Sequence, residues 1–362
     1  MLDFIKDKSY YLLGGTVIIL VIVILIGSCA NKNTGTNYEK IEEKMKLAAK
    51  SYYDARKDKL PKEDGGVVKV NIGTLVDAEL LDEVKDPKDK NSICTGYVEV
   101  TKVGDDYSYS PLLNCKGNYE PKHLTDVIKS ATTDEYGNGV YNLNGEYVYR
   151  GKDVNNYLKF DNKLWRIIKI DKDGDIKIVS AEPTEDSYPY DTAYNSEAED
   201  SSGITTDYLK TDIRKTLNDY YKSNLSKDAK SKMIKKELCI GGYLLTDEFS
   251  YEKECSKKTT TKEYISLLNV SDYQNASLSA DCKFLNNREC SNYNYLANRN
   301  FRSWLLNTLQ EKSYKVLNIS SGSISSTTAS NERRLNFVLY LNNNVLISNG
   351  DGTESNPFYI KK

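Results

Sequence analysis

Apolar side chains near the start of the chain recur at helical spacing. They lie three and four residues apart with Glu and Lys between them, which predicts an amphipathic helix that ends before Leu60-Pro61. The positions that define this face are Ile41, Met45, Ala48, Tyr52 and Ala55. An apolar run at 67–70, a helical stretch at 74–81 and strand-like alternation at 97–100 follow.

Short apolar runs in the second half of the chain predict strands around two helices. One helix is predicted from Leu209, Ile213, Leu217 and Tyr220, which share a face, and another begins after Ser226 as its N-cap. The predicted strands lie at 147–149, 157–160, 164–170, 176–179, 304–306, 316–319, 337–341 and 345–347. The predicted fold class is α+β, with short antiparallel strands in this part of the chain.

The chain has 362 residues, which favours two domains. A small α+β domain is predicted at 38–118 and a larger one at 141–362. Residues 119–140 show no sustained period and contain Gly137-Asn138-Gly139, so they are predicted to be a linker.

Residues 12–30 carry no charged side chain and are long enough to cross a bilayer as a helix. We predict a single transmembrane helix here, with residues 1–11 as a cytoplasmic tail. The sequence 26–29 is also similar to a lipobox, in which Cys29 is acylated after cleavage of a lipoprotein signal. In the first alternative the membrane is a partner through residues 12–30, and in the second through the acylated Cys29 of this segment.

The cysteines after Cys29 fall into three sequence-local couples. Their spacing does not match the close couples of zinc sites, and the chain has one His, so disulfides are favoured over metal. The predicted pairs are Cys94 with Cys115, Cys239 with Cys255, and Cys282 with Cys290. Disulfides persist in oxidising compartments, so the C-terminal bulk is predicted to lie outside the cytoplasmic membrane of a single-pass protein.

The charge balance narrows the class of partner. The chain has 50 Lys and Arg against 52 Asp and Glu, and this gives no field that would attract nucleic acid. The alternating acids at 171–175 suggest calcium, but Gly174 lies at the wrong position for an EF-hand loop, and Asp-Gly between apolar runs favours a hairpin turn. No metal, cofactor or nucleic-acid partner is expected.

Candidate catalytic groups are sparse. His123 is the only imidazole available for Ser-His or Cys-His catalysis, and its place in the predicted linker favours a solvated or capping role. No feature of the sequence selects a carboxylate pair of the glycosidase kind. No catalytic residue is predicted, and the chain is expected not to be an enzyme.

Acidic and tyrosine side chains are interleaved over residues 182–200. This composition is typical of a surface that binds a cation, a cationic peptide or a carbohydrate, and a solvated loop is the alternative. The candidate ligand surface consists of Asp186, Tyr188, Tyr190, Asp191 and Tyr194.

The small domain carries short patterns at 46–53, 72–76 and 94–98. In these it resembles globular domains of Gram-positive surface proteins with a pilin-like layout. The resemblance implies a long N-terminal helix against a short antiparallel sheet.

The larger domain contains an ordered series of segments at 156–160, 164–168, 266–273, 304–306, 322–324, 338–341 and 350–358. This order is similar to that of C-type-lectin-like domains of bacterial surface proteins, which are distant relatives in fold of the formylglycine-generating enzymes. The resemblance covers most of residues 145–362 and implies a compact scaffold with variable loops. Asn336-Phe337 stands where such domains often carry Arg-Pro, so the role of that Arg is not carried over.

The expected function is that of a membrane-anchored surface protein that binds an extracellular glycan, peptide or protein. The sequence lacks the Glu-Pro-Asn, Gln-Pro-Asp and Trp-Asn-Asp motifs of calcium-dependent sugar binding. One alternative is a structural component of a cell-envelope or secretion assembly. Another is an envelope hydrolase whose acidic residues the sequence does not single out.

Overall fold

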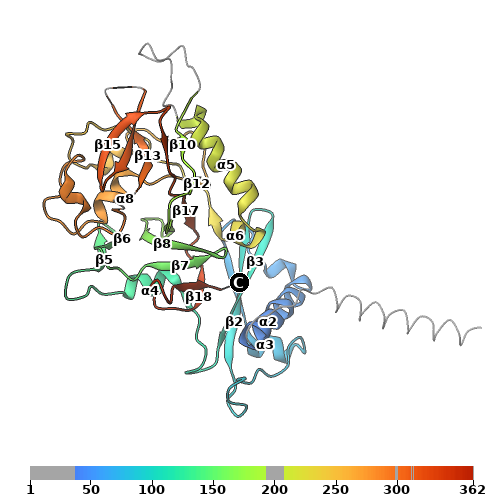
Figure 1. Ribbon diagram of the computed structural model, residues 1–362. Helices are drawn as coiled ribbons and strands as arrows, with labels where there is room; N and C mark the ends of the chain where they lie inside the picture. Colours follow the sequence, from blue (N-terminus) through green and yellow to red (C-terminus); the bar gives the residue numbers. More distant parts are fainter. Residues whose placement is uncertain (1–36, 193–207, 298–300, 311, 313, 362) are drawn as a thin grey trace, which may run out of the picture. The chain divides into compact units, whose positions relative to one another are not determined.

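The chain divides into two compact units, which are described separately. The computed structural model describes residues 37–192, 208–297, 301–310, 312 and 314–361. Unit 1 ends at Glu120 and unit 2 begins at Pro121 (Figure 1).

Unit 1 is a helix packed on a three-stranded antiparallel sheet with the order β1-β2-β3. Helix α2 buries Met45, Ala49 and Tyr53, and the sheet contributes Val98 and Val100 to the same core. The elements are α2 (Asn37–Asp54), η1 (Lys57–Lys59), β1 (Val67–Asn71), α3 (Ile72–Asp77), β2 (Thr95–Val103) and β3 (Asp106–Asn114).

The main sheet of unit 2 has the strand order β11-β17-β9-β8-β7-β19-β18-β4, and three further strands join it at β17 and β8. Its pairings are antiparallel except that of β19 with β7. Its strands are β4 (Lys122–His123), β5 (Gly139–Leu143), β6 (Glu146–Arg150), β7 (Tyr157–Phe160), β8 (Lys163–Ile170), β9 (Ile176–Ser180), β11 (Met233–Ile234), β12 (Ile265–Ser266), β17 (Val338–Leu341), β18 (Leu346–Asn349) and β19 (Phe358–Ile360).

Smaller sheets and short helices complete unit 2. One sheet has the order β13-β14-β15, and β10 pairs with β16. These strands are β10 (Tyr188–Pro189), β13 (Arg302–Thr308), β14 (Lys315–Ser320), β15 (Ser323–Thr328) and β16 (Glu332–Arg333). The helices are α4 (Leu124–Ser130), η2 (Tyr208–Lys210), α5 (Asp212–Asn224), α6 (Lys227–Lys232), α7 (Tyr251–Glu254), α8 (Val270–Asn275) and η3 (Arg288–Ser291).

Strand β8 separates two parts of the core of unit 2. Successive side chains of a strand point to opposite faces. Trp165 and Ile167 accordingly join one hydrophobic cluster, and Ile168 joins another. Arg166 shares the parity of Ile168, so its guanidinium faces the second side of the sheet. The strand therefore places the charged guanidinium of Arg166 in a partly buried position.

The sequence predicted many of these elements. The predicted strands lie within or beside β6, β7, β8, β9, β13, β14, β17 and β18, and Ser226 caps α6 by accepting a hydrogen bond from Ala229 N. Asp171 to Asp175 form the turn between β8 and β9. The predicted linker is corrected: β4 and α4 lie inside it, and Leu124 and Ile128 are fully buried in the core of unit 2.

The predicted fold class is wrong in its transmembrane helix. Across the part of the chain that the structure describes, the helices are short or amphipathic, and none is long and apolar enough to cross a membrane. Residues 12–30 and Cys29, on which that prediction fell, lie outside the described residues. The fold class of the described chain is α+β, with mostly strands and short helices.

Candidate functional site

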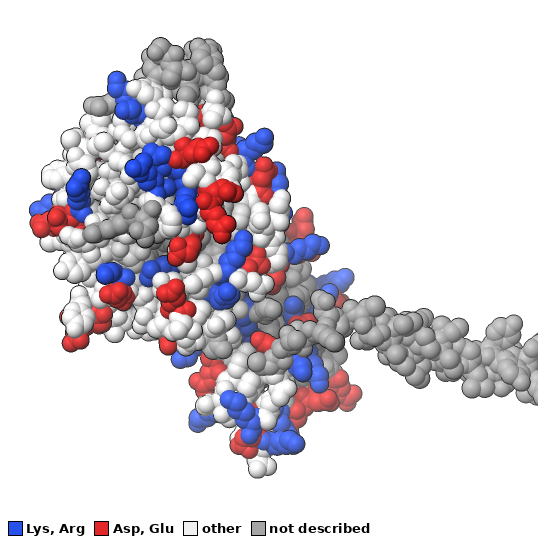
Figure 2. All heavy atoms as spheres, in the orientation of Figure 1, with Lys and Arg blue, Asp and Glu red and all other residues white. Residues whose placement is uncertain are grey.

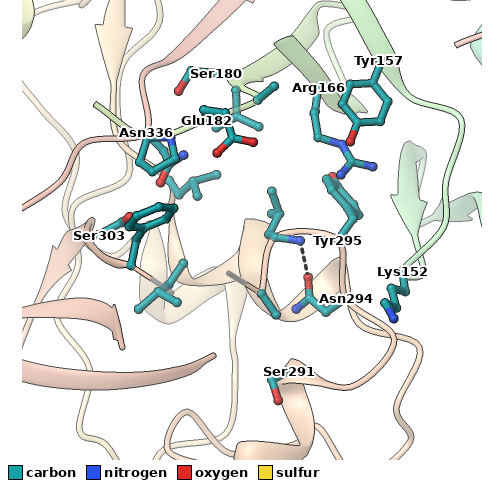
Figure 3. Close-up of a pocket in the computed structure, with 18 of the residues that line it drawn as sticks. Lys152, Tyr157, Arg166, Ser180, Glu182, Ser291, Asn294, Tyr295, Ser303 and Asn336 are labelled. Carbon is teal, nitrogen blue, oxygen red and sulfur yellow. Dashed lines mark hydrogen bonds between the residues drawn. The ribbon is translucent and has the colours of Figure 1, made fainter. Parts of the chain in front are cut away.

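A cavity of about 770 Å³ opens in unit 2. This volume falls in the range of roughly 300–1,000 Å³ that small-molecule sites occupy. Its wall is formed by the segment after β9, by residues 291–297, and by single side chains from β7, β8 and β13. Most of the labelled side chains of Figure 3 lie around the open centre of this cavity, and Ser291 lies farther from it.

Arg166 of β8 is the central cation of the wall. Its Nε donates to Asn156 Oδ1 at 2.8 Å, and its Nη2 donates to the carbonyl of Val154 at 3.3 Å. The rings of Tyr157 and Tyr295 lie 4.2 and 4.6 Å from its guanidinium carbon. Nη1 makes no hydrogen bond with the described residues.

The environment of Arg166 favours an anion. Burial lowers the pKa of Arg166 from its ordinary value, although the guanidinium keeps its charge in proteins. A cation that has lost part of its hydration binds a carboxylate more strongly than a fully solvated one does. Arg also presents a planar fork that suits bidentate binding of a carboxylate.

Asn156 holds Arg166 in place. It is fully buried, and its Nδ2 donates to the carbonyl of Ile167 at 2.7 Å. Its own carbonyl accepts from Ile167 N at 2.8 Å. Because Asn156 is tied to β8 at two points, the oxygen that accepts from Arg166 is fixed before any ligand arrives.

Gly352 holds Tyr157 in place beside Arg166. Its carbonyl accepts from Tyr157 N at 2.8 Å, which places the tyrosine ring beside the guanidinium. Gly352 has φ +81°, and a Cβ there would lie 2.4 Å from the carbonyl oxygen of Asn155. Only glycine fits this approach without displacing the backbone.

Glu182 lies on the opposite wall, in the segment that follows β9. Figure 3 shows its carboxylate pointing into the cavity across from Arg166. The side chain is exposed, and no ion pair or hydrogen bond joins its carboxylate to the residues that the structure describes. The described lining contains no other acid, and no His or Cys.

The loop 291–297 forms a rigid rim. Asn294 Nδ2 donates to the carbonyls of Tyr273 and Cys290, both at 2.8 Å, and its Oδ1 accepts from Leu296 N at 2.9 Å (Figure 3). Tyr293 is 63% exposed and has φ +49°, a conformation that is unusual for an aromatic residue.

A second cavity of about 450 Å³ in unit 2 is lined by several charged side chains, some of which form ion pairs. Lys177 Nζ lies 2.6 Å from Asp272 Oδ2, and Lys169 Nζ lies 2.9 Å from Glu146 Oε1. In both pairs the two charges compensate each other.

Lys236 fills the centre of the acidic turn. Its Nζ lies 3.0, 2.8 and 2.5 Å from the Oδ2 atoms of Asp171, Asp173 and Asp175. Burial lowers the pKa of Lys236. The hydrogen bonds and charges of the three aspartates together raise it by more than burial lowers it, so the pKa of Lys236 lies above its ordinary value. The three carboxylates could hold a metal ion by their spacing, and the ammonium occupies the position between them.

Glu254 of α7 is 2% exposed beside the same cavity. Burial raises the pKa of Glu254 to about 7, the nearby Asp272 raises it too, and hydrogen bonds from Ser271 lower it. This carboxyl therefore changes its charge near neutral pH.

The predicted ligand surface at 182–200 is divided by the structure. Asp186 is exposed and Tyr188 half-buried, whereas Tyr190 and Asp191 are fully buried; Tyr194 lies outside the described residues. Tyr190 Oη donates to the carbonyl of Leu306 at 3.1 Å, and its ring packs edge-on against Trp304. These contacts place Tyr190 and Asp191 in the core rather than on a surface.

The three disulfides are confirmed. The structure joins Cys94 to Cys115, Cys239 to Cys255, and Cys282 to Cys290. His123 lies in β4, opposite Leu346 of β18. The residues around Arg166 were missed, although an Arg inside the apolar run 164–170 was the signal that could have found them.

Comparison with known proteins adds no relative. No family model matches the chain, and no curated protein or solved structure does either. The resemblances to C-type-lectin-like and pilin-like domains therefore stay predictions.

Proposed function

We propose that the chain is an extracytoplasmic binding protein whose unit 2 binds the carboxylate of a ligand through Arg166. The observation that carries the proposal is the geometry of Arg166. Asn156, Val154 and two tyrosine rings hold its guanidinium at the wall of the cavity, and its Nη1 makes no hydrogen bond with the described residues. A group fixed in this way before binding loses little entropy when the ligand arrives.

The three disulfides support the extracytoplasmic location, because such bonds persist in oxidising compartments. The uncharged segment 12–30 supports a route to the cytoplasmic membrane, with both units outside the cell. On the face drawn in Figure 2, acidic and basic side chains are interspersed. We infer that a local charge, that of Arg166, selects the ligand.

The described lining also supports binding over catalysis. It contains one carboxylate and neither His nor Cys, so a pair of acids or an activated nucleophile is not assembled among these residues. The structural and hydrolase alternatives remain predictions.

The experiment is binding of the full-length protein to arrays of acidic glycans and peptides, each printed with free and with amidated carboxyl groups. We expect the free carboxylates to bind and their amides to bind about tenfold more weakly or worse. Equal binding of both forms, or no binding of either, would overturn the proposal. This comparison needs no variant, so it does not depend on folding.

Arg166→Lys tests the same point on the protein. Lys keeps the charge and loses the fork, so we expect about tenfold weaker binding of carboxylates. Arg288→Lys is the control, because Arg288 is exposed in unit 2 and does not line the cavity. Near-ultraviolet circular dichroism checks that both variants retain their packing.

A further inference from the structure

Two opposite charges face one cavity without pairing. Arg166 lies on β8 and Glu182 on the segment after β9, and Figure 3 shows them on opposite sides of the open centre, with the guanidinium of Arg166 between the rings of Tyr157 and Tyr295. Among the described residues, no ion pair links the two. Glu354 and Asp153 do not line the cavity. Their charges raise the pKa of Arg166, and neither forms an ion pair with it.

This arrangement discriminates between classes of ligand. A ligand with only a carboxylate satisfies Arg166 and brings a second negative charge toward Glu182. A neutral sugar leaves both charges without a partner, which costs binding energy once water is displaced. A ligand with an anionic and a cationic end compensates both.

The remaining wall suits an amide backbone between those ends. Ser180, Ser303 and Asn336 lie on the side of Glu182 in Figure 3, and their hydroxyl and amide groups both donate and accept hydrogen bonds. Tyr157 and Tyr295 offer apolar ring surface beside Arg166. Lys152 is exposed at the edge of the cavity and offers a second, solvated cation.

We propose that the cavity binds a short peptide with free amino and carboxyl ends, with the carboxylate on Arg166 and the ammonium on Glu182. The inference rests on the proposed role of Arg166 and adds Glu182 as the residue that determines specificity. Binding is non-covalent, and no bond in the peptide changes.

The test uses trialanine, N-acetyl-trialanine and trialaninamide with the full-length protein in titration calorimetry. Acetylation removes the ammonium and amidation removes the carboxylate. We expect each modification to weaken binding to the wild-type protein by about tenfold or more. Glucuronate, an acid without an ammonium, is expected to bind more weakly than trialanine.

Glu182→Gln separates the two ends. In this variant acetylation of the peptide is expected to weaken binding by less than about twofold. Amidation is expected to weaken binding as much as it does in the wild-type protein. Glu185→Gln is the matched control, because Glu185 is an exposed acid three positions away that does not line the cavity. In this control both acetylation and amidation should weaken binding as they do in the wild-type protein.

The outcomes distinguish the two proposals. If N-acetyl-trialanine or glucuronate binds as tightly as trialanine, the role of Glu182 is overturned and that of Arg166 stands. An acetylation penalty that persists in Glu182→Gln has the same meaning. If no probe with a carboxylate binds at millimolar concentration, both proposals fail.

Discussion

Glu254 accepts two hydrogen bonds from Ser271, one from the backbone N–H at 2.9 Å and one from the hydroxyl at 2.7 Å. Both residues are almost completely buried, and the charged groups beside Glu254 are Asp272 and Lys177. A carboxyl in such surroundings holds its proton more tightly in the folded chain than in the unfolded one.

The stability of unit 2 should therefore depend on pH through Glu254. Its pKa is about 7 in the folded chain against 4.5 as the ordinary value, so the folded state binds more protons between these pH values. The contribution is complete below pH 4.5 and is lost as the pH rises through 7. We expect the free energy of unfolding to fall by up to roughly 3 kcal/mol over this window.

Urea unfolding of Glu254→Gln between pH 5 and 8 measures this effect. The amide cannot ionise and can still pair with Ser271, so the slope with pH should flatten. Glu252→Gln, an exposed neighbour in α7, should keep the wild-type slope. An unchanged slope in Glu254→Gln would show that other groups cause the dependence.

Gly352 and Gly145 provide a matched pair of substitutions. Both have positive φ, +81° and +90°, but a Cβ at Gly145 meets nothing within 4 Å, whereas one at Gly352 lies 2.4 Å from Asn155 O. Gly145→Ala should cost about 1 kcal/mol of stability from its backbone conformation. Gly352→Ala should cost about 1–3 kcal/mol more and weaken carboxylate binding, because Tyr157 moves. Thermal unfolding compares the two, and equal losses would contradict the argument.

Lys236→Met tests the acidic turn. Without the ammonium, three carboxylates within 4.8 Å of one another repel. We expect a loss of roughly 1–3 kcal/mol at pH 7, smaller at pH 4, because burial raises the pKa of Asp175 and this carboxyl takes up a proton more readily there. Millimolar calcium should restore stability in this variant and leave the wild type unchanged. Lys235→Met is the control, and a calcium response there too would point to a different site.

The local elements were predictable because their causes are local. The alternation around Trp165 specifies a strand, and the order Asp-Gly at 173–174 specifies its turn. The disulfides followed from the spacing of neighbouring cysteines, since two short segments already hold each pair close. The helix α4 was missed because its apolar residues are few and lie in a polar stretch.

The candidate site could not be predicted in the same way. Arg166 becomes a binding group only when Asn156, Tyr157 and Tyr295 surround it, and Tyr295 comes from a distant part of the chain. The tyrosines at 188 and 190 matched the composition of a ligand surface, but Tyr190 packs against Trp304 in the core. Composition does not report which face of a short strand is covered.

The disulfides also bear on how the chain reaches its native state. Each joins cysteines that follow one another along the sequence, and the next couple begins only after the previous one ends. When such a chain crosses a membrane with unit 1 ahead of unit 2, each bond can close before the cysteines of the next couple emerge. Correct oxidation then requires an oxidant but no isomerase to rearrange mispaired bonds.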